Sequence, residues 1–155
     1  MHLRKLVGIA GITALVAGSL SGTAFGHGDK ERFEESQYRH DLMEHANYAI
    51  SNIVQLIKGK ASHDGHLEKL ADIMALSASM TKDAFEKDTR GMEGHTSAKD
   101  AVWENWEDFA ERADKYTADT AAFAEAAKSG DQEATMAAFK KAASNCKSCH
   151  DKYQD

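Results

Sequence analysis

The chain contains no proline among its 155 residues. At the average usage of about 5%, a chain of this length would carry roughly eight prolines. Proline interrupts a helix because it lacks a backbone donor and clashes with the preceding turn, so its absence leaves long helices unbroken. Hydrophobic residues make up 42% of the sequence and charged residues 28%, as in one ordinary globular domain. The sequence therefore favours an all-α fold before any periodicity is considered.

The first 26 residues have the three regions of a secretory signal peptide. Arg4 and Lys5 form a positive start, residues 6–20 an apolar stretch, and residues 24–26 a small-x-small cleavage site. The apolar stretch is shorter than the roughly 20 residues needed to cross a membrane, which favours cleavage over a retained anchor. We predict that residues 1–26 are removed and that residues 27–155 form one domain, exported to the periplasm without a membrane anchor.

Acidic residues outnumber basic ones in the exported domain. The whole chain has 19 basic and 25 acidic residues, and the signal peptide removes two basic residues and no acidic one. Binding to nucleic acid needs a cationic face that neutralises phosphates. Nucleic acid is therefore not an expected partner. Acidic runs such as Glu107-Asp108 are expected to form solvated helix faces.

Glycines divide the exported domain into four segments. Gly59 and Gly65 bracket one polar stretch, Gly91 and Gly94 bracket a second, and Gly130 marks a third. Each segment repeats apolar residues at intervals of three and four, which is the period of an amphipathic helix. The predicted helices span residues 30–58, 65–87, 97–128 and 131–153. As capping residues we predict Asp131 for the fourth helix, Asp64 for the second, and Ser97 or Thr96 for the third.

Short loops between long amphipathic helices are typical of antiparallel neighbours. We therefore predict an up-down-up-down four-helix bundle. A coiled-coil dimer is the alternative, but a long two-stranded coil would not interrupt its heptads at every loop. The predicted core is rich in alanine, so the helices alone leave a gap for something else to fill.

The last predicted helix contains Cys146-Lys147-Ser148-Cys149-His150, which is the attachment sequence for a c-type haem. Residues at i, i+3 and i+4 of a helix share one face, so both thiols can reach the vinyl groups of one porphyrin edge. The imidazole of His150 can then reach the haem iron. We predict one covalently attached haem c, with Cys146 and Cys149 as thioether anchors and His150 as the proximal iron ligand.

Three other interpretations of these two cysteines stay open. A thioredoxin-like redox pair usually lies in a βαβ unit, which this helical chain does not offer. A zinc site needs further ligands, and none of the eight histidines is paired with another cysteine at finger spacing. A chance match without a cofactor is the third, and it is disfavoured because export is what haem attachment of this kind requires.

An exported helical chain with this motif close to its C-terminus resembles the class II c-type cytochromes, the cytochrome c-prime family. Residues 38–43 are similar to the family's first-helix segment, and residues 103–109 to the start of its third helix. The resemblance implies a four-helix bundle that binds haem inside it, near the C-terminal helix. It also implies a homodimer formed through the first two helices.

The resemblance gives roles to two residues of the first helix. Arg39 would pair with a haem propionate, which suits its charge and its planar fork of donors. His40 stands where family members commonly have Gln. Met43 would lie over the distal face of the haem, either as the sixth iron ligand or as an apolar wall. By periodicity alone, Met43 is a core residue.

Together these residues predict a periplasmic monohaem cytochrome that carries single electrons between redox partner proteins and turns over no substrate. The alternative is a five-coordinate haem protein that binds nitric oxide or carbon monoxide, with Met43 as a steric gate. A peroxidase-like or nitric-oxide-reducing enzyme ranks third, because no distal acid–base pair is evident in the sequence.

Overall fold

The computed structural model describes residues 31–155, so the predicted signal peptide lies outside the described residues. Within the described part, all the regular structure is helical apart from two isolated β-bridges. None of these helices is both long enough and apolar enough to cross a membrane. The all-α prediction is confirmed. The helices are α1 (Glu34–Ile57), α2 (His66–Glu86), the short α3 (Ala101–Glu104), α4 (Trp106–Lys128) and α5 (Gln132–Tyr153).

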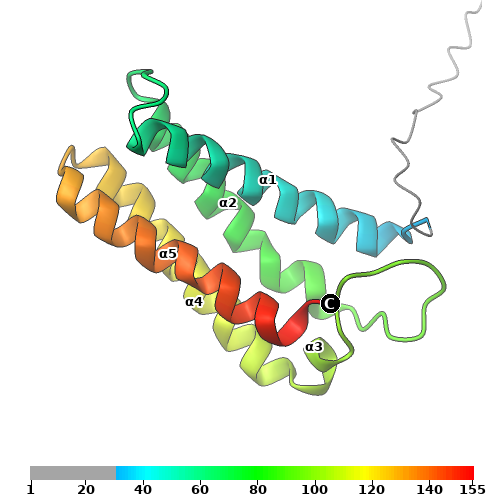
Figure 1. Ribbon diagram of the computed structural model, residues 1–155. Coiled ribbons are helices and arrows are strands. Elements are labelled where there is room, and N and C mark those ends of the chain that lie inside the picture. The colour runs from blue at the N-terminus through cyan, green and yellow to red at the C-terminus, as the bar shows by residue number, and fades with distance from the viewer. Residues whose placement is uncertain (1–30) are drawn as a thin grey trace, which may run out of the picture.

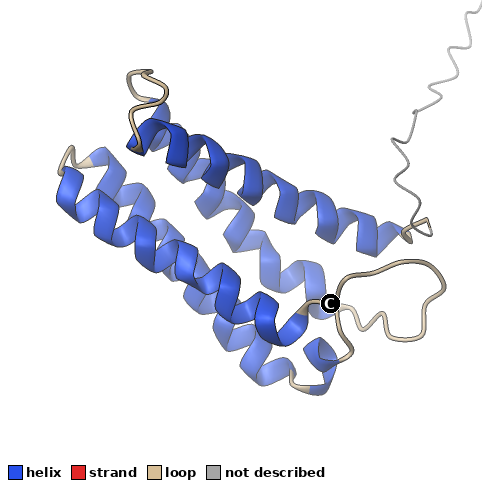
Figure 2. Ribbon diagram, viewed as in Figure 1, coloured by secondary structure: helices blue, strands red, loops and turns tan. Residues whose placement is uncertain are grey.

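The four long helices alternate in direction and form a bundle (Figure 1). α1 packs against α2, α2 against α4, and α4 against α5. α1 and α5 are not among the extensively packed pairs. Figure 2 shows the α1–α2 and α4–α5 loops at one end of the bundle and the longer loop between α2 and α3 at the other. This is the predicted up-down-up-down bundle, so the coiled-coil alternative is wrong.

The third helix begins later than the predicted residue 97. Residues 87–100 form a loop, α3 adds a single turn, and α4 begins after a break at Asn105, where φ is −126° and ψ is 45°. The backbone of this loop pairs with the end of α5, because Lys99 N donates to Tyr153 O at 2.9 Å and Asp155 N donates to Ser97 O at 3.0 Å. These distant partners replace the helical hydrogen bonds that the sequence pattern predicts.

One of the three predicted helix caps is confirmed. Asp131 accepts a hydrogen bond from Ala134 N at 3.0 Å and so caps α5. The prediction for the second helix is wrong, because Gly65 occupies the cap position of α2 and Asp64 makes no capping bond. The prediction for the third helix is also wrong. Thr96 accepts from Ala98 N within the loop, before any helix begins.

The loop at residues 87–100, which we call the closing loop, also joins the start of α1. His95 N donates to Glu31 O at 3.1 Å, and Ser36 Oγ donates to His95 O at 2.8 Å. Since the loop also bonds to Tyr153 and Asp155, it connects α1 with α5 at the end where these helices do not pack extensively.

We expect Gly94→Ala to destabilise the domain through the closing loop. Gly94 has φ +122°, and an added Cβ would lie 3.0 Å from Glu31 O and 3.2 Å from Phe33 N. Backbone strain and the contact with main-chain atoms together should cost about 3 kcal/mol. Chemical denaturation measures the loss in the free energy of unfolding. The control is Gly91→Ala, where φ is +77° but no atom lies within 4 Å, and about 1 kcal/mol is expected. If both variants lose the same free energy of unfolding, the close contact between residue 94 and the backbone of residues 31 and 33 would be contradicted.

Candidate haem site

A cavity of about 500 Å³ lies between α1 and α5, at the end of the bundle that the closing loop covers. α1 contributes Arg39 and Met43 to its wall, and α5 contributes Cys146, Cys149 and His150. The structure therefore brings all five predicted site residues to one cavity. Of the buried core alanines, Ala46 and Ala113 line this cavity, whereas others such as Ala71, Ala124 and Ala142 pack in the core away from it.

The two cysteines are half-buried free thiols on the cavity wall. Burial raises the pKa of both thiols above the ordinary value. A thioredoxin-like pair needs a lowered pKa to supply its thiolate, so this environment disfavours that interpretation. Within residues 31–155, no three His, Cys, Asp or Glu side chains are arranged to hold a metal ion.

His150 lies at the edge of the same cavity and is exposed to solvent on one side. Enough protein surrounds the imidazole to lower its pKa, and Asp151 opposes this shift. Lowering the pKa favours the neutral imidazole, which is the form that coordinates a metal. His150 follows Cys149 directly and lies one turn beyond Cys146, so all three reach the cavity from one face of α5.

Arg39 is a buried cation with an unused donor. Its side chain packs over the rings of Phe33, Phe85 and Trp103, with the guanidinium carbon 5.0–5.7 Å from their centroids. Nη2 donates to Thr89 Oγ1 at 3.1 Å, while Nη1 is the one buried side-chain nitrogen or oxygen in residues 31–155 without a hydrogen-bond partner. Burial lowers the pKa of Arg39, but an arginine stays charged in proteins.

Such a cation costs free energy unless an anion or acceptor reaches it. Because Arg39 lines the cavity, a bound group with a carboxylate would satisfy Nη1. Haem fits this requirement, since its propionates are carboxylates and its porphyrin is apolar. The residues present therefore fit haem on three counts: the space, the thiols beside an imidazole, and the buried cation.

Met43 is half-buried in the cavity wall, one helical turn after Arg39. Both residues lie on the same face of α1, and Ile50 continues that face along the wall. The cavity wall also includes Phe85 of α2, and Arg112 and Tyr116 of α4, for which the sequence predicts no role at the site. Their spacing matches that of ordinary helix residues, so no signal in the sequence separates them from core or surface positions.

Residues 34–154 match the family model described as Cytochrome C'. The chain belongs to the cytochrome c' family. The predicted class II c-type cytochrome is therefore confirmed, and so is the covalently attached haem c that the cytochromes c' carry.

Individual cytochromes agree with this assignment. The chain is 29% identical to cytochrome c-556 of Agrobacterium tumefaciens (strain B2A) over 120 residues, which cover 77% of this chain and 96% of that protein. The structure of cytochrome c prime from Shewanella frigidimarina matches with a TM-score of 0.71 and 28% identity, over 78% and 94% of the two chains. A cytochrome c' described as having ligand-controlled dimer dissociation matches with a TM-score of 0.70 and 25% identity, over 77% and 93%.

Proposed function

We propose that the chain is a periplasmic one-electron carrier that holds its haem c in the cavity between α1 and α5. Cys146 and Cys149 would form the two thioether bonds, and Arg39 would bind a propionate. His150 and Met43 would coordinate the iron. The haem iron supplies a change between two oxidation states by a single electron.

The observation that carries this proposal is the unpaired donor of Arg39 in a cavity shared with the attachment motif. These residues would set the reduction potential of the haem through the ligands of its iron and through a nearby charge. Imidazole and thioether ligands together raise the reduction potential and favour electron transfer. The buried guanidinium would raise it further, because a nearby cation disfavours the more positive ferric state.

We expect Arg39→Gln to lower the reduction potential of the haem. Loss of a partly screened cation should shift the potential by about 40 mV, which corresponds to about 1 kcal/mol for one electron. A potentiometric titration of the purified holoprotein measures the shift and should give a one-electron curve. Arg90→Gln is the matched control, because Arg90 pairs with Asp88 outside the cavity and should leave the potential unchanged. Equal potentials for both variants would place the haem away from Arg39.

We propose in addition that two copies of the chain associate through α1 and α2. Leu76, Ile73 and Met80 form an exposed apolar stripe on α2, and Tyr38 and Tyr48 are exposed on α1. Burying such a stripe against its copy removes apolar surface from water. Sedimentation of the holoprotein should give twice the mass of the chain. A single-chain mass across micromolar concentrations would contradict this association.

A further inference from the structure

α5 is a basic helix in an acidic protein. Residues 134–150, which include the attachment motif, contain no acidic side chain, and Lys140, Lys141 and Lys147 are exposed. The chain as a whole has 25 acidic and 19 basic residues, and two of the basic ones lie in the predicted signal peptide. The helix that bears the motif therefore has a charge opposite to that of the domain.

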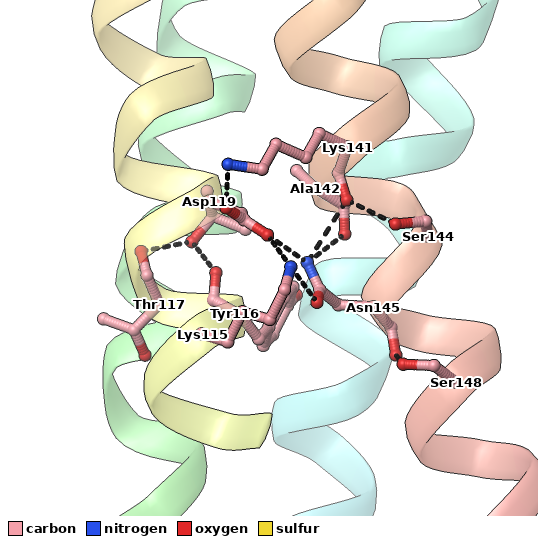
Figure 3. Close-up of polar contacts among 10 residues, drawn as sticks. Lys115, Tyr116, Thr117, Asp119, Lys141, Ala142, Ser144, Asn145 and Ser148 are labelled. Carbon is pink, nitrogen blue, oxygen red and sulfur yellow. Dashed lines mark hydrogen bonds and ion pairs between the residues drawn. The ribbon is translucent and has the colours of Figure 1, made fainter. Parts of the chain in front are cut away.

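The carboxylate of Asp119, on α4, contacts two lysines at once. Lys141 Nζ of α5 lies 2.9 Å from this carboxylate, and Lys115 Nζ of α4 also donates to it (Figure 3). Burial raises the pKa of Asp119, but hydrogen bonds from these lysines and from Asn145 outweigh burial and bring the pKa to about 2. The carboxylate is therefore ionised at neutral pH. One negative charge then stands against two positive ones.

Asp108 of α4 is shared in the same way. It accepts hydrogen bonds from Arg112 Nε at 2.7 Å and from Lys152 Nζ of α5 at 2.9 Å. Between these contacts and the start of the motif, Lys147 pairs with Asp151 at 2.7 Å, and both side chains of this pair are exposed. Positive charge is thus in excess along the side of α5 that faces the solvent.

We call this surface the basic face. It consists of the cations Arg112, Lys115, Lys140, Lys141, Lys147 and Lys152 with the carboxylates Asp108, Asp119 and Asp151. The acidic residues of α4 outside it, Glu107, Glu111 and Asp114, are rotated toward α2, where Asp114 pairs with Lys82. The excess of positive charge is therefore on the α5 side of α4.

No large apolar side chain is exposed on the basic face. In residues 31–155 the exposed large hydrophobic side chains lie on α1, α2 and the closing loop: Tyr38, Tyr48, Ile73, Leu76, Met80 and Met92. A helix that binds a membrane inserts apolar side chains into the lipid, and the interfaces of homodimers are comparatively apolar. A charged surface without such side chains suits the small and weak contacts between redox proteins.

The basic face lies next to the haem attachment motif. Lys147 stands between Cys146 and Cys149 in the sequence, and it is exposed while both thiols line the cavity. In the proposed function the porphyrin is bonded to these thiols. The thickness of one helix, about 10 Å, would then separate a protein docked on this face from the haem edge.

We propose that the basic face is the docking surface for a redox partner whose contact surface is rich in carboxylates. The proposal rests on the proposed function, in which the chain carries single electrons. Opposite charges steer two proteins together and fix their orientation. The net charge of the domain repels such a partner, so the basic face decides which side makes contact. Exposed ion pairs stabilise little, so Lys147 can exchange Asp151 for a carboxylate of the partner at small cost.

The test uses the purified holoprotein on gold electrodes coated with a carboxylate-terminated or an amine-terminated monolayer. The carboxylate surface is the probe for an acidic partner. At low ionic strength we expect an adsorbed one-electron wave that is larger on carboxylate than on amine, although the net charge of the domain favours the amine. Lys147→Glu should reduce the wave on carboxylate about fivefold, and salt at about 0.5 M should remove the wave of the unmutated protein.

Lys60→Glu is the matched control. It changes the net charge by the same amount, but Lys60 is exposed in the loop between α1 and α2, at the end of the bundle away from the motif (Figure 1). It should keep the wave. Lys140→Glu is a second variant of the basic face that leaves the motif residues unchanged, and it should also weaken the wave.

Equal losses for Lys147→Glu and Lys60→Glu, or a larger wave on amine, would overturn the docking role of the basic face. Co-sedimentation of the unmutated protein with phosphatidylglycerol vesicles at physiological salt would overturn a protein partner in favour of a lipid surface. A potentiometric titration in solution separates the two proposals. If it gives no one-electron curve, the proposed function fails, whereas a normal curve with unselective variants refutes the docking surface alone.

Discussion

Replacing Cys146 and Cys149 together by Ala is expected to abolish covalent haem and to weaken the fold. A group that binds the native state stabilises it, and without anchors the haem can dissociate. The cavity of about 500 Å³ and the unpaired Arg39 Nη1 would then be left without their partner. Acid–acetone extraction followed by intact mass measures attachment, and circular dichroism on heating measures the loss of helical stability.

Lys147→Ala is the control for the double variant. Lys147 lies between the two cysteines, is exposed, and within residues 31–155 pairs only with Asp151 on its own helix. It should keep its haem and almost all of its stability, because an exposed i,i+4 pair contributes about 0.3–0.5 kcal/mol. Recovery of the porphyrin on the double variant would contradict the assignment. So would an unmodified apo-chain recovered for the unmutated protein from cells with working cytochrome maturation.

Met43→Ala is expected to change the iron from low spin to high spin, to lower the reduction potential and to open the iron to carbon monoxide. The reason is that Met43 of α1 and His150 of α5 line the same cavity, where under the proposed function the thioether would coordinate the haem iron together with the imidazole. If Met43 is a ligand as proposed, removing its sulfur would leave the iron with one ligand fewer. Absorption spectra of both oxidation states, with and without carbon monoxide, measure the change.

Ile50→Ala is the control for Met43→Ala. Ile50 lines the same cavity from the same helix, so its truncation enlarges the cavity and leaves the sulfur in place. It should stay low spin and should not take up carbon monoxide. If Ile50→Ala behaves like Met43→Ala, the size of the cavity decides the spin state and the role of Met43 as a ligand is wrong.

The helices could be predicted from the sequence because their signals are local. Apolar spacing and the absence of proline decide α1, α2 and α5, and the predicted bounds differ from the structure by a few residues. The start of the third helix could not be predicted in this way. Ser97 and Lys99 bond to residues of the C-terminal end, more than 50 positions away, and no local pattern contains that partner.

The sequence predicts a cavity residue only where a motif or a family resemblance points to it. The motif indicated Cys146, Cys149 and His150, and the resemblance indicated Arg39 and Met43; all five line the cavity. The contacts between acidic residues of α4 and the helix α5 could not be predicted from the sequence, for a physical reason. An acidic residue on an amphipathic helix is expected to face water, as we expected for Glu107-Asp108, yet Asp108 bonds the buried Tyr153.

Asp119 shows the same limitation more strongly. It is nearly inaccessible because Lys115, Lys141 and Asn145 surround its carboxylate. Two of these partners lie on α5, so the sequence of α4 alone gives no sign that the charge is buried. Only the packing of the two helices brings this carboxylate beside the attachment motif (Figure 3).

The most direct test of an electron carrier with Met43 and His150 as iron ligands is the absorption spectrum of the unmutated, purified protein. It should be recorded in the ferric and ferrous states, with and without carbon monoxide. A six-coordinate iron cannot bind an added ligand without first losing Met43, so we predict low-spin spectra in both states and no change with the gas. A high-spin iron that takes up carbon monoxide readily would contradict this assignment. Met43 would then be only a wall of the cavity, and gas binding would replace electron transfer as the favoured function.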